Sequence, residues 1–387
     1  MYIERTLRER LSAARRSFLL LGPRQTGKST LIRSLAPELE INLADEETYV
    51  AFLRDPGLLK QRIRDAATVF IDEIQRIPSL LNTVQYLLDQ ERPPKFLLTG
   101  SSARKLKRGK ANLLPGRIFT YELGPLSCSE LGERFDLRRA LRRGLLPGIY
   151  LEKDSETWTK LLRSYAVTYL KEEIQAEALT RNLEGFSRFF DVICSRSGEF
   201  VDFTKFASLA SIERMSARRY FDVLADTLVV RAIEPFAKSS RVRLIQHPRF
   251  YLYDVGVLNG ALGNFEASPD RVGNLFEHLV LQLLWSEFQG RDEQIRLSVY
   301  RTEAGAEVDL ILERKGTVFA IEIKAKKKIG SGDLRGLRSF AAFYGRTHTP
   351  LVVYMGEHPA RMDGVEILPV KMALAKLAPG GSSAKGR

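Results

Sequence analysis

The octet Gly22–Ser29 fits the pattern G-x-x-x-x-G-K-[ST] and constrains this chain more than any other feature. Glycines let such a loop turn its N–H groups toward phosphate oxygens, while the lysine reaches the β- and γ-phosphates and the hydroxyl ligates Mg²⁺. The apolar run Ser17–Leu21 precedes the octet, and Ser29–Leu35 can open a helix whose N-terminus favours anions. These flanks favour a phosphate-binding loop over an ordinary glycine-rich turn. The expected contact residues are Gly22, Pro23, Arg24, Gln25, Thr26, Gly27, Lys28, Ser29 and Thr30.

Composition narrows the class of protein and the kind of partner. The 387 residues, 44% hydrophobic and 28% charged, suggest two or three globular domains. A net charge of +13 favours a polyanionic partner, nucleic acid before an acidic membrane, although solubility alone would also explain it. No run approaches the roughly 18 apolar residues of a membrane span, and the N-terminus lacks a signal peptide's apolar core. We therefore expect a cytoplasmic protein with no membrane partner.

Cysteine and histidine offer little chemistry. Two cysteines, Cys128 and Cys194, are too few for a disulfide framework or a cysteine-based metal site. The four histidines show no metal-ligand spacing. Both cysteines are expected to be buried small hydrophobic residues.

A second half of an ATPase site follows the loop in sequence. Thr68–Ile71 are strand-forming residues that lead directly into Asp72 and Glu73. Beside a phosphate loop, Asp72 is expected to hold the Mg²⁺ shell and Glu73 to polarise the attacking water. In isolation the same pair would be a helix cap after a buried strand. The next expected strand begins at Lys95 and ends in polar residues, of which Thr99 and Ser101 are candidates to sense the γ-phosphate, unless they only cap a turn.

These segments resemble the AAA-type ATPases of bacteria and archaea, in which an additional strand lies between the loop strand and the Asp-Glu strand. Leu114–Arg117 and Phe119–Leu126 are also similar to the prokaryotic subgroup whose AAA domain precedes an uncharacterised C-terminal domain. The resemblance implies ATP and Mg²⁺ as cofactors and a homo-oligomer, a hexamer by analogy. It further implies an arginine that completes the neighbouring subunit's site. Arg117 is the first candidate and Arg104 the second, with a surface ion pair as the alternative for Arg117.

A basic run follows the candidate sensor strand. It places five positive charges within seven residues, without an acid. Such a run gives sequence-independent, salt-sensitive affinity for a phosphate backbone, although a solvated loop is the alternative. The residues are Arg104, Lys105, Lys107, Arg108 and Lys110.

Two segments of the N-terminal part are predicted to be helical: residues 1–16, as a basic amphipathic helix, and residues 46–66.

The middle of the chain is predicted to be mostly helical as well. A helix over Val201–Ala210, a second over Ser216–Leu224 capped by Ser216, and a strand over Leu228–Ile233 follow the order of a winged helix. The second helix of that motif can enter a major groove, where Arg218 and Arg219 would face phosphates or bases. Protein binding or simple packing are the alternatives.

The C-terminal third carries a second constellation. Glu277 lies on an expected helix, Asp309 on a strand, and Glu322 and Lys324 on the next strand of a hairpin. Alternation points both side chains of Glu-x-Lys to one face, where carboxylates and a lysine can bind Mg²⁺ and activate water. The arrangement resembles the PD-(D/E)xK nuclease superfamily, with Val308 where its name has proline. That resemblance implies Asp309 and Glu322 as metal ligands, Lys324 as the water-positioning residue and Glu277 as the helix acid. Solvated strand residues are the alternative.

The expected fold class is α/β. It comprises an AAA-type P-loop parallel-sheet domain (1–126), a helical lid (127–185), a winged helix (186–245), a PD-(D/E)xK nuclease-like α/β domain (246–376) and a disordered tail (377–387). The expected function is ATP hydrolysis coupled to binding and remodelling or translocating DNA, as in a helicase or branch-migration motor. The alternatives are a nucleotide-switched protein-binding module and an ATP-regulated, metal-dependent nuclease.

Overall fold

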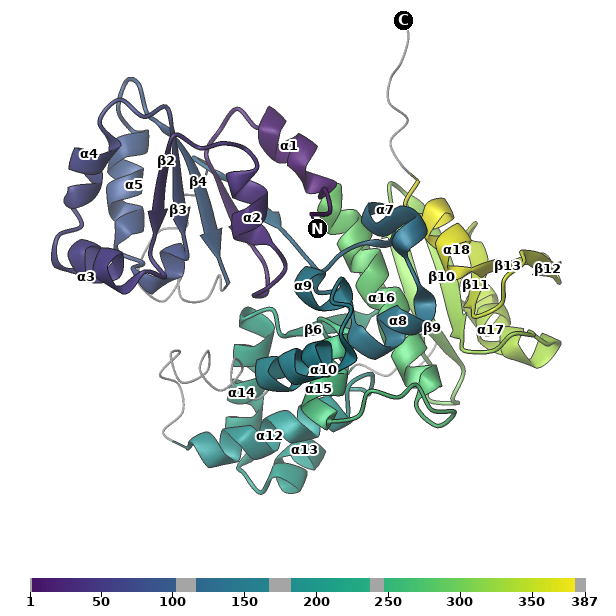
Figure 1. The fold of residues 1–387 in the computed structure, drawn as a ribbon. Coiled ribbons are helices and arrows are strands. Elements are labelled where there is room, and N and C mark those ends of the chain that lie inside the picture. The colour runs from purple at the N-terminus through teal and green to yellow at the C-terminus, as the bar shows by residue number, and fades with distance from the viewer. Residues whose placement is uncertain (1, 102–115, 167–181, 237–246, 380–387) are drawn as a thin grey trace, which may run out of the picture.

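The computed structural model describes residues 2–101, 116–166, 182–236 and 247–379. Two sheets lie at opposite ends of the molecule, with helices of the middle region beside them (Figure 1). The predicted α/β class is confirmed. No described helix is long and apolar enough to cross a membrane.

The N-terminal sheet is parallel throughout, in the order β2-β3-β4-β1-β5. The strand predicted after Lys95 therefore does lie between the loop strand and the Asp-Glu strand. A parallel sheet must be covered on both faces, and the three central strands β3, β4 and β1 are accordingly largely apolar and buried. The strand bounds are β1 Phe18–Leu21, β2 Leu39–Asn42, β3 Thr68–Asp72, β4 Lys95–Gly100 and β5 Phe119–Glu122.

Two apolar clusters cover the two faces of this sheet. On one face Leu7, Leu11 and Leu31 of α1 and α2 pack against Phe18 and Leu20, and the helices α3, α4 and α5 cover the other. The helices are shorter than the patterns predict. The segment 46–66 divides into two helices around Pro56, because proline disfavours a helical conformation at the preceding residue. The bounds are α1 Leu7–Ala13, α2 Lys28–Arg33, α3 Glu46–Arg54, α4 Leu58–Ile63, the 3₁₀ turn η1 Ile74–Arg76, and α5 Leu80–Leu88.

The middle region is helical, as predicted. Two close contacts between α8 and the start of α15 require glycine. A Cβ at Gly256 would lie 2.0 Å from the carbonyl oxygen of Arg143, and a Cβ at Gly144 would lie 2.0 Å from Oδ1 of Asp254. The bounds are α7 Cys128–Leu131, the 3₁₀ turn η2 Gly132–Arg134, α8 Leu137–Arg143, α9 Pro147–Tyr150, α10 Ser155–Ser164, α12 Leu183–Ser195, α13 Phe203–Ala210, α14 Arg214–Asp226 and α15 Val255–Leu262.

One predicted helix start is wrong. The helix α14 begins at Arg214, with Glu213 as its N-cap residue, so Ser216 lies inside the helix and caps nothing. A serine before an apolar run is only a weak boundary signal, because it is also tolerated within a helix.

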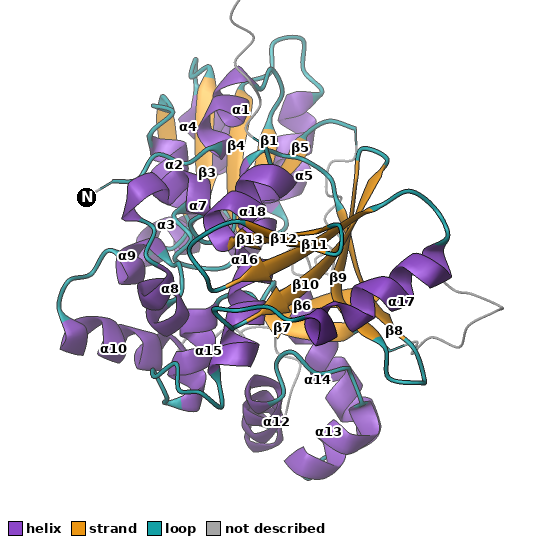
Figure 2. Ribbon diagram, turned by 90° about the vertical axis from the view of Figure 1, so that its right-hand side faces the viewer, coloured by secondary structure: helices purple, strands orange, loops and turns teal. Residues whose placement is uncertain are grey.

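The C-terminal sheet is mixed, in the order β12-β13-β11-β10-β9-β8-β6-β7 (Figure 2). The predicted hairpin is present, since β9 and β10 pair antiparallel. The long helix α16 and the C-terminal helix α18 pack on one face, and α17 packs on the other. The bounds are β6 Val230–Pro235, β7 Arg249–Leu252, β8 Arg296–Arg301, β9 Glu307–Arg314, β10 Thr317–Lys324, β11 Thr349–Tyr354, β12 Ala360–Met362 and β13 Val365–Pro369, with α16 Val272–Gly290, the 3₁₀ turn η4 Ser331–Leu334, α17 Arg335–Tyr344 and α18 Val370–Leu377.

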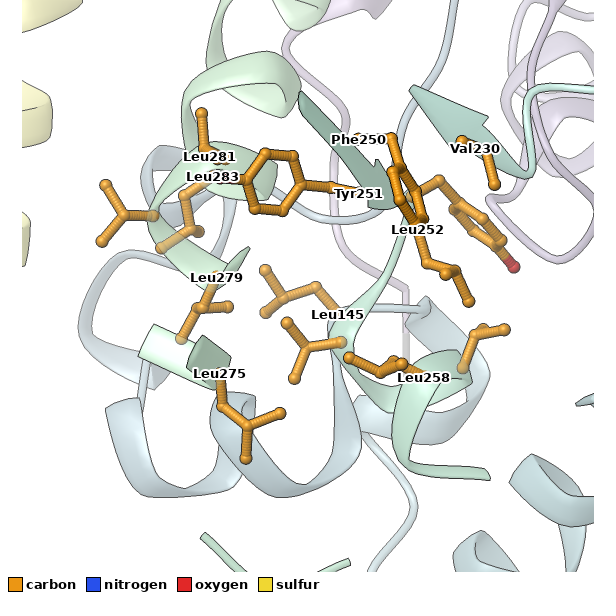
Figure 3. Close-up of a cluster of buried hydrophobic side chains, with 14 of the residues drawn as sticks. Leu145, Val230, Phe250, Tyr251, Leu252, Leu258, Leu275, Leu279, Leu281 and Leu283 are labelled. Atoms are coloured by element: carbon orange, nitrogen blue, oxygen red, sulfur yellow. The ribbon is translucent and has the colours of Figure 1, made fainter. Parts of the chain in front are cut away.

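The helices α12 to α14 join this sheet through β6 and β7. The strand β6 follows α14 and pairs in parallel with β8, while β7 pairs antiparallel with β6. A single apolar cluster consequently extends from the middle helices into the sheet. Figure 3 shows part of it, which includes Phe250 and Leu252 of β7, Leu145, Leu258 and leucines of α16. Each fully buried leucine or phenylalanine contributes about 1.5–3 kcal/mol to folding.

Both cysteines are buried small side chains. Burial raises the pKa of the Cys128 thiol to about 12 and that of Cys194 well above its usual value. Neither thiol is therefore poised to act as a nucleophile near neutral pH.

His278 makes the stability of this core depend on pH. The imidazole is completely buried on α16 beside Tyr251, and burial lowers its pKa to about 4. The unfolded chain, with a histidine pKa near 6.5, binds the proton first as the pH falls, so stability is lost between about pH 6.5 and pH 4.

Replacing this imidazole by a neutral side chain should remove that loss. We expect urea unfolding of His278→Gln to depend less on pH than that of the parent by up to about 1.4 kcal/mol per pH unit in this window. His358→Gln, at an exposed position, is the matched control and should leave the profile unchanged. Parallel profiles for the parent and His278→Gln would contradict the assignment.

Candidate functional site

The phosphate-loop residues connect the end of β1 to the start of α2. A Cβ at Gly22 would lie 2.2 Å from the carbonyl oxygen of Leu123, at the end of the neighbouring strand, so only glycine fits there. Gly27 has φ +90°, a conformation that favours glycine, immediately before Lys28 begins α2. The close packing at one glycine and the turn at the other bring the loop over the N-terminus of the helix.

Lys28 is buried within this loop. Its ammonium donates hydrogen bonds to the carbonyl oxygens of Gly22 at 2.9 Å and Pro23 at 3.0 Å, and the Thr26 hydroxyl also donates to Pro23. A positive charge is thus held where the octet predicts it, in front of the N-terminus of α2.

The acidic strand end lies beside the loop. The Ser29 hydroxyl donates to Oδ1 of Asp72 at 2.9 Å, and the Thr99 hydroxyl donates to the same oxygen. Thr99 also accepts a hydrogen bond from the backbone N–H of Glu73 at 3.2 Å. Hydrogen bonds therefore connect four predicted site residues, which are Ser29 of α2, Asp72 of β3, Glu73 directly after β3 and Thr99 of β4.

Glu73 has a partner that the sequence did not reveal. Its backbone is left-handed, with φ 59°, and its carboxylate accepts a hydrogen bond from Nε2 of Gln75. The same amide nitrogen donates to the Ser101 hydroxyl at 3.0 Å, and Gln75 is buried. The glutamine thus connects the candidate water-polarising residue to the candidate sensor. Its only sequence signal is its position two residues after Glu73.

Arg5 is a second residue that sequence reasoning missed. Its guanidinium is buried and donates to the carbonyl oxygens of Thr26 at 2.6 Å and Gly124 at 2.8 Å, and it forms an ion pair with Glu130 at 3.0 Å. This arginine ties the N-terminal segment to the loop, and residues 2–5 are consequently outside the helix predicted over 1–16.

A cavity of about 370 Å³ opens beside the loop. Its polar side includes Thr26, Gly27 and Thr30, and its apolar side includes Ile3 and Leu126. The remaining lining residues are Tyr2, Arg5, Pro147, Gly148, Leu151 and Glu152. Its size and mixed lining suit a small organic ligand attached to a phosphate group in the loop.

The predicted arginine of a neighbouring site, Arg117, lies at the opposite end of the parallel strands from the loop. It precedes β5, whereas the loop follows the parallel strand β1. Its exposed guanidinium pairs with Asp89 at 2.8 and 3.2 Å. Arg117 therefore does not contact the loop of its own chain. The other candidate, Arg104, lies outside the described residues, as do Lys105, Lys107, Arg108 and Lys110.

Arg218 and Arg219 are both exposed on α14. Arg219 extends over the ring of Tyr220, with 5.5 Å between the guanidinium carbon and the ring centroid. Their positive charges are available to a partner.

The C-terminal constellation is brought together, with protein cations inside it. Lys324 lies 3.2 Å from Glu322 and 3.5 Å from Asp309, and Asp309 also accepts from the backbone N–H of Ile323. Glu277 pairs with Arg249 at 2.8 Å. Each of the three predicted carboxylates thus has a positively charged protein partner.

Burial changes the titration of two of these acids. It raises the pKa of Glu277 to about 7, and burial together with the charge of Asp309 raises the pKa of Glu322 to about 9. In the described parts of the chain no three His, Cys, Asp or Glu side chains are arranged to hold a metal ion. Asp309 and Glu322 are both paired with Lys324, and Glu277 is paired with Arg249, so the divalent cation implied by the nuclease resemblance does not fit this pocket as it is arranged.

Three families match successive parts of the chain. A family described as AAA domain matches residues 14–132. Two domains of unknown function, DUF8612 and DUF4143, match residues 134–268 and 272–373. The match to residues 134–268 includes parts of both the segment predicted as a helical lid and the segment predicted as a winged helix.

Two curated relatives, the uncharacterized proteins Rv2008c of Mycobacterium tuberculosis and Mb2031c of Mycobacterium bovis, are each 30% identical over 351 residues. The alignment covers 88% of this chain and 76% of each relative.

The similarity of this chain to solved structures is lower. The replication initiator DnaA bound to AMPPCP and single-stranded DNA has a TM-score of 0.25 and 12% identity, over 57% of this chain and 86% of that chain. A signal transduction ATPase with a tetratricopeptide repeat sensor from Pyrococcus horikoshii has a TM-score of 0.24 and 14% identity, over 75% of this chain and 47% of that chain. No functional conclusion rests on similarity this low.

Proposed function

The chain belongs to the same family as the uncharacterized mycobacterial proteins, and it carries an AAA domain followed by two domains of unknown function. On that premise we propose that it hydrolyses ATP to bind and remodel DNA. The observation that carries the ATPase part is the contact network of Ser29, Asp72, Thr99 and Glu73. These residue types, at the ends of neighbouring strands and beside a buried lysine, suit a phosphate group and its cation.

The residues present fit Mg–ATP. The Ser29 hydroxyl and the Asp72 carboxylate would hold Mg²⁺, which when bound neutralises charge on the phosphates. Lys28 and the loop N–H groups bind the phosphate oxygens. The cavity of about 370 Å³ beside Thr26 and Gly27 takes the base and sugar.

Glu73 is proposed to accept a proton from the attacking water. Its side chain needs a fixed orientation for that role, which the hydrogen bond from Gln75 supplies. Gln75 also donates to the Ser101 hydroxyl, and the Thr99 hydroxyl accepts from the backbone N–H of Glu73. A change at either hydroxyl when the γ-phosphate is lost would therefore affect Glu73, which supports the sensing role proposed for both.

A ring would complete the site, by analogy with AAA-type ATPases. Arg117 lies at the amino end of β5 and the loop lies at the carboxyl end of the neighbouring strand β1, so the nucleotide that Arg117 is proposed to serve is a neighbouring subunit's. We propose a homo-oligomer, a hexamer by analogy, in which Arg117 leaves Asp89 to stabilise charge on the transferring phosphoryl group.

DNA is the proposed polyanion. The net charge of +13 and the exposed pair Arg218 and Arg219 support it. We expect duplex DNA to bind at low salt and to stimulate ATP hydrolysis. Reversing both charges in Arg218→Glu/Arg219→Glu should weaken binding about tenfold or more, measured by fluorescence anisotropy across a salt series.

The matched control changes net charge equally at a distant site. Arg54→Glu/Arg64→Glu alters two exposed arginines at the ends of α3 and α4 and should bind DNA nearly as the parent does. Equal losses in both double variants would show only a nonspecific charge effect. If DNA neither binds nor changes turnover, the DNA proposal fails, and a nucleotide-switched protein-binding module takes its place.

A further inference from the structure

Two cavities of the C-terminal half meet at one arginine. A cavity of about 450 Å³ contains Asp309, Glu322 and Lys324, and a larger one of about 750 Å³ lies between the start of α13 and the sheet. Arg249 and Glu307 line both. Arg249 therefore separates the predicted carboxylate site from the neighbouring cavity.

Arg249 is held firmly in that position. Nη1 lies 2.8 Å from Glu277 and 3.1 Å from Glu307, Nη2 donates to Glu277 at 3.3 Å, and Nε donates to the carbonyl oxygen of Gly198. The side chain is 13% exposed, and its guanidinium lies over the ring of Phe200. The arginine thus connects the acid of α16 to the first residue of β9 with charge-assisted hydrogen bonds, which are stronger than neutral ones.

Lys324 does the same for the other two acids. It lies within 3.5 Å of both Asp309 and Glu322 and is itself largely buried. Four carboxylates in and beside the pocket thus pair with protein cations. Glu277 and Glu307 contact Arg249, Asp309 and Glu322 contact Lys324, and Glu307 also lies 3.5 Å from Arg301.

A divalent cation would have to compete with these contacts. Mg²⁺ and Mn²⁺ need several oxygen ligands close together, at about 2.0–2.1 Å in the case of Mg²⁺. A divalent cation bound between Glu277 and Asp309 would displace Arg249 from its ion pairs. The two positive charges of the ion would then lie beside the buried positive charge of the guanidinium. Unlike charges at such distances in a poorly solvated site interact strongly, and like charges repel as strongly.

We infer that Arg249 is the resident cation of this pocket: it takes the place of a divalent metal ion beside Glu277 and Glu307, so the chain binds no Mg²⁺ or Mn²⁺ there. This inference is independent of the proposed ATPase and DNA functions. It separates this chain from the metal site that its carboxylate pattern resembles. Removing the guanidinium should leave Glu277 without its cation and Glu307 with Arg301 alone, so that a divalent cation can take the place of Arg249.

The test counts bound Mn²⁺ on the full, nucleotide-free chain by isothermal titration calorimetry and electron paramagnetic resonance. Arg249→Met, which keeps the apolar stem and loses the charge, should bind one more Mn²⁺ than the parent, or bind it at least tenfold more tightly. Arg249→Lys should behave as the parent does. The loop site with Ser29 and Asp72 is identical in all variants, so it cancels in the comparison.

Two further variants locate the gained site. Arg249→Met/Glu277→Gln should lose the extra Mn²⁺, and Arg338→Met, which breaks the exposed pair with Asp363, should gain none. Two results would overturn the inference. One is that the parent binds a Mn²⁺ that Glu277→Gln removes, and the other is that Arg249→Met folds but binds no additional Mn²⁺.

Glu277→Gln with Arg249 in place keeps the inference testable if Arg249→Met does not fold. This single variant and the parent should bind equal numbers of Mn²⁺ when Arg249 is the resident cation. A loss of one Mn²⁺ in the variant would show that the pocket holds metal in the parent.

Discussion

Lys28→Ala is expected to lower ATP hydrolysis at least about a hundredfold, because it removes the buried positive charge that the loop holds in front of α2. Preorganised charges and donors directed at a transferring group are each worth about two to three powers of ten in rate. Steady-state phosphate release at saturating ATP and Mg²⁺ measures the effect. Lys60→Ala, an exposed lysine of α4 in the same domain, is the matched control and should hydrolyse ATP normally.

The same variant also reports on the oligomer. Arg117→Ala should hydrolyse slowly but still bind nucleotide, and mixing it with Lys28→Ala should recover part of the activity if Arg117 acts on a neighbour. Recovery needs one interface with an intact loop on one side and an intact arginine on the other. No recovery in subunits that are shown to exchange would rule out the role in trans, and full turnover in Lys28→Ala alone would contradict the loop assignment itself.

Glu73→Gln is expected to hydrolyse ATP at least about a hundredfold more slowly while it binds ATP as tightly as the parent. The amide keeps the shape of the carboxylate but cannot accept the proton of the attacking water, and general-base catalysis contributes about 10²–10⁴ to a rate. The nucleotide that stays bound, separated by chromatography after a single turnover, should be ATP rather than ADP.

Glu46→Gln is the control for this substitution. It makes the same chemical change in an exposed acid that pairs with Arg76, so turnover should be unaffected. If Glu73→Gln releases phosphate at the parent rate, another group accepts the proton. If it fails to bind ATP, the carboxylate supports the loop rather than the chemistry.

Prediction from the sequence succeeded where function needs a local pattern. Gly22 and Gly27 lie a fixed number of residues from Lys28, and the strand-forming residues before Asp72 form β3 as predicted. The hairpin of β9 and β10 followed from the same reasoning, whereas the place of β4 between β1 and β3 was implied by the resemblance to AAA-type ATPases. Patterns of this kind depend on backbone geometry within a few residues.

It failed where a residue's role depends on a distant partner. Arg5 meets Gly124 and Glu130, which are far along the chain, and nothing in its neighbours marks it as a loop contact. Gln75 becomes important only because β4 places Ser101 beside it. The helix predicted over residues 1–16 is shorter for the same reason, since its first residues bind the loop.

The sequence by itself determined that this chain carries a phosphate-binding loop, an acidic strand end beside it, and Glu277, Asp309, Glu322 and Lys324 in a recognisable order. The tertiary structure decided what surrounds them. Pairing of β6 with β8 places β7, and with it Arg249, between Glu277 and Glu307. The charge of a pocket is the sum of all side chains that folding brings within a few ångströms, and their separation along the chain carries no record of that distance.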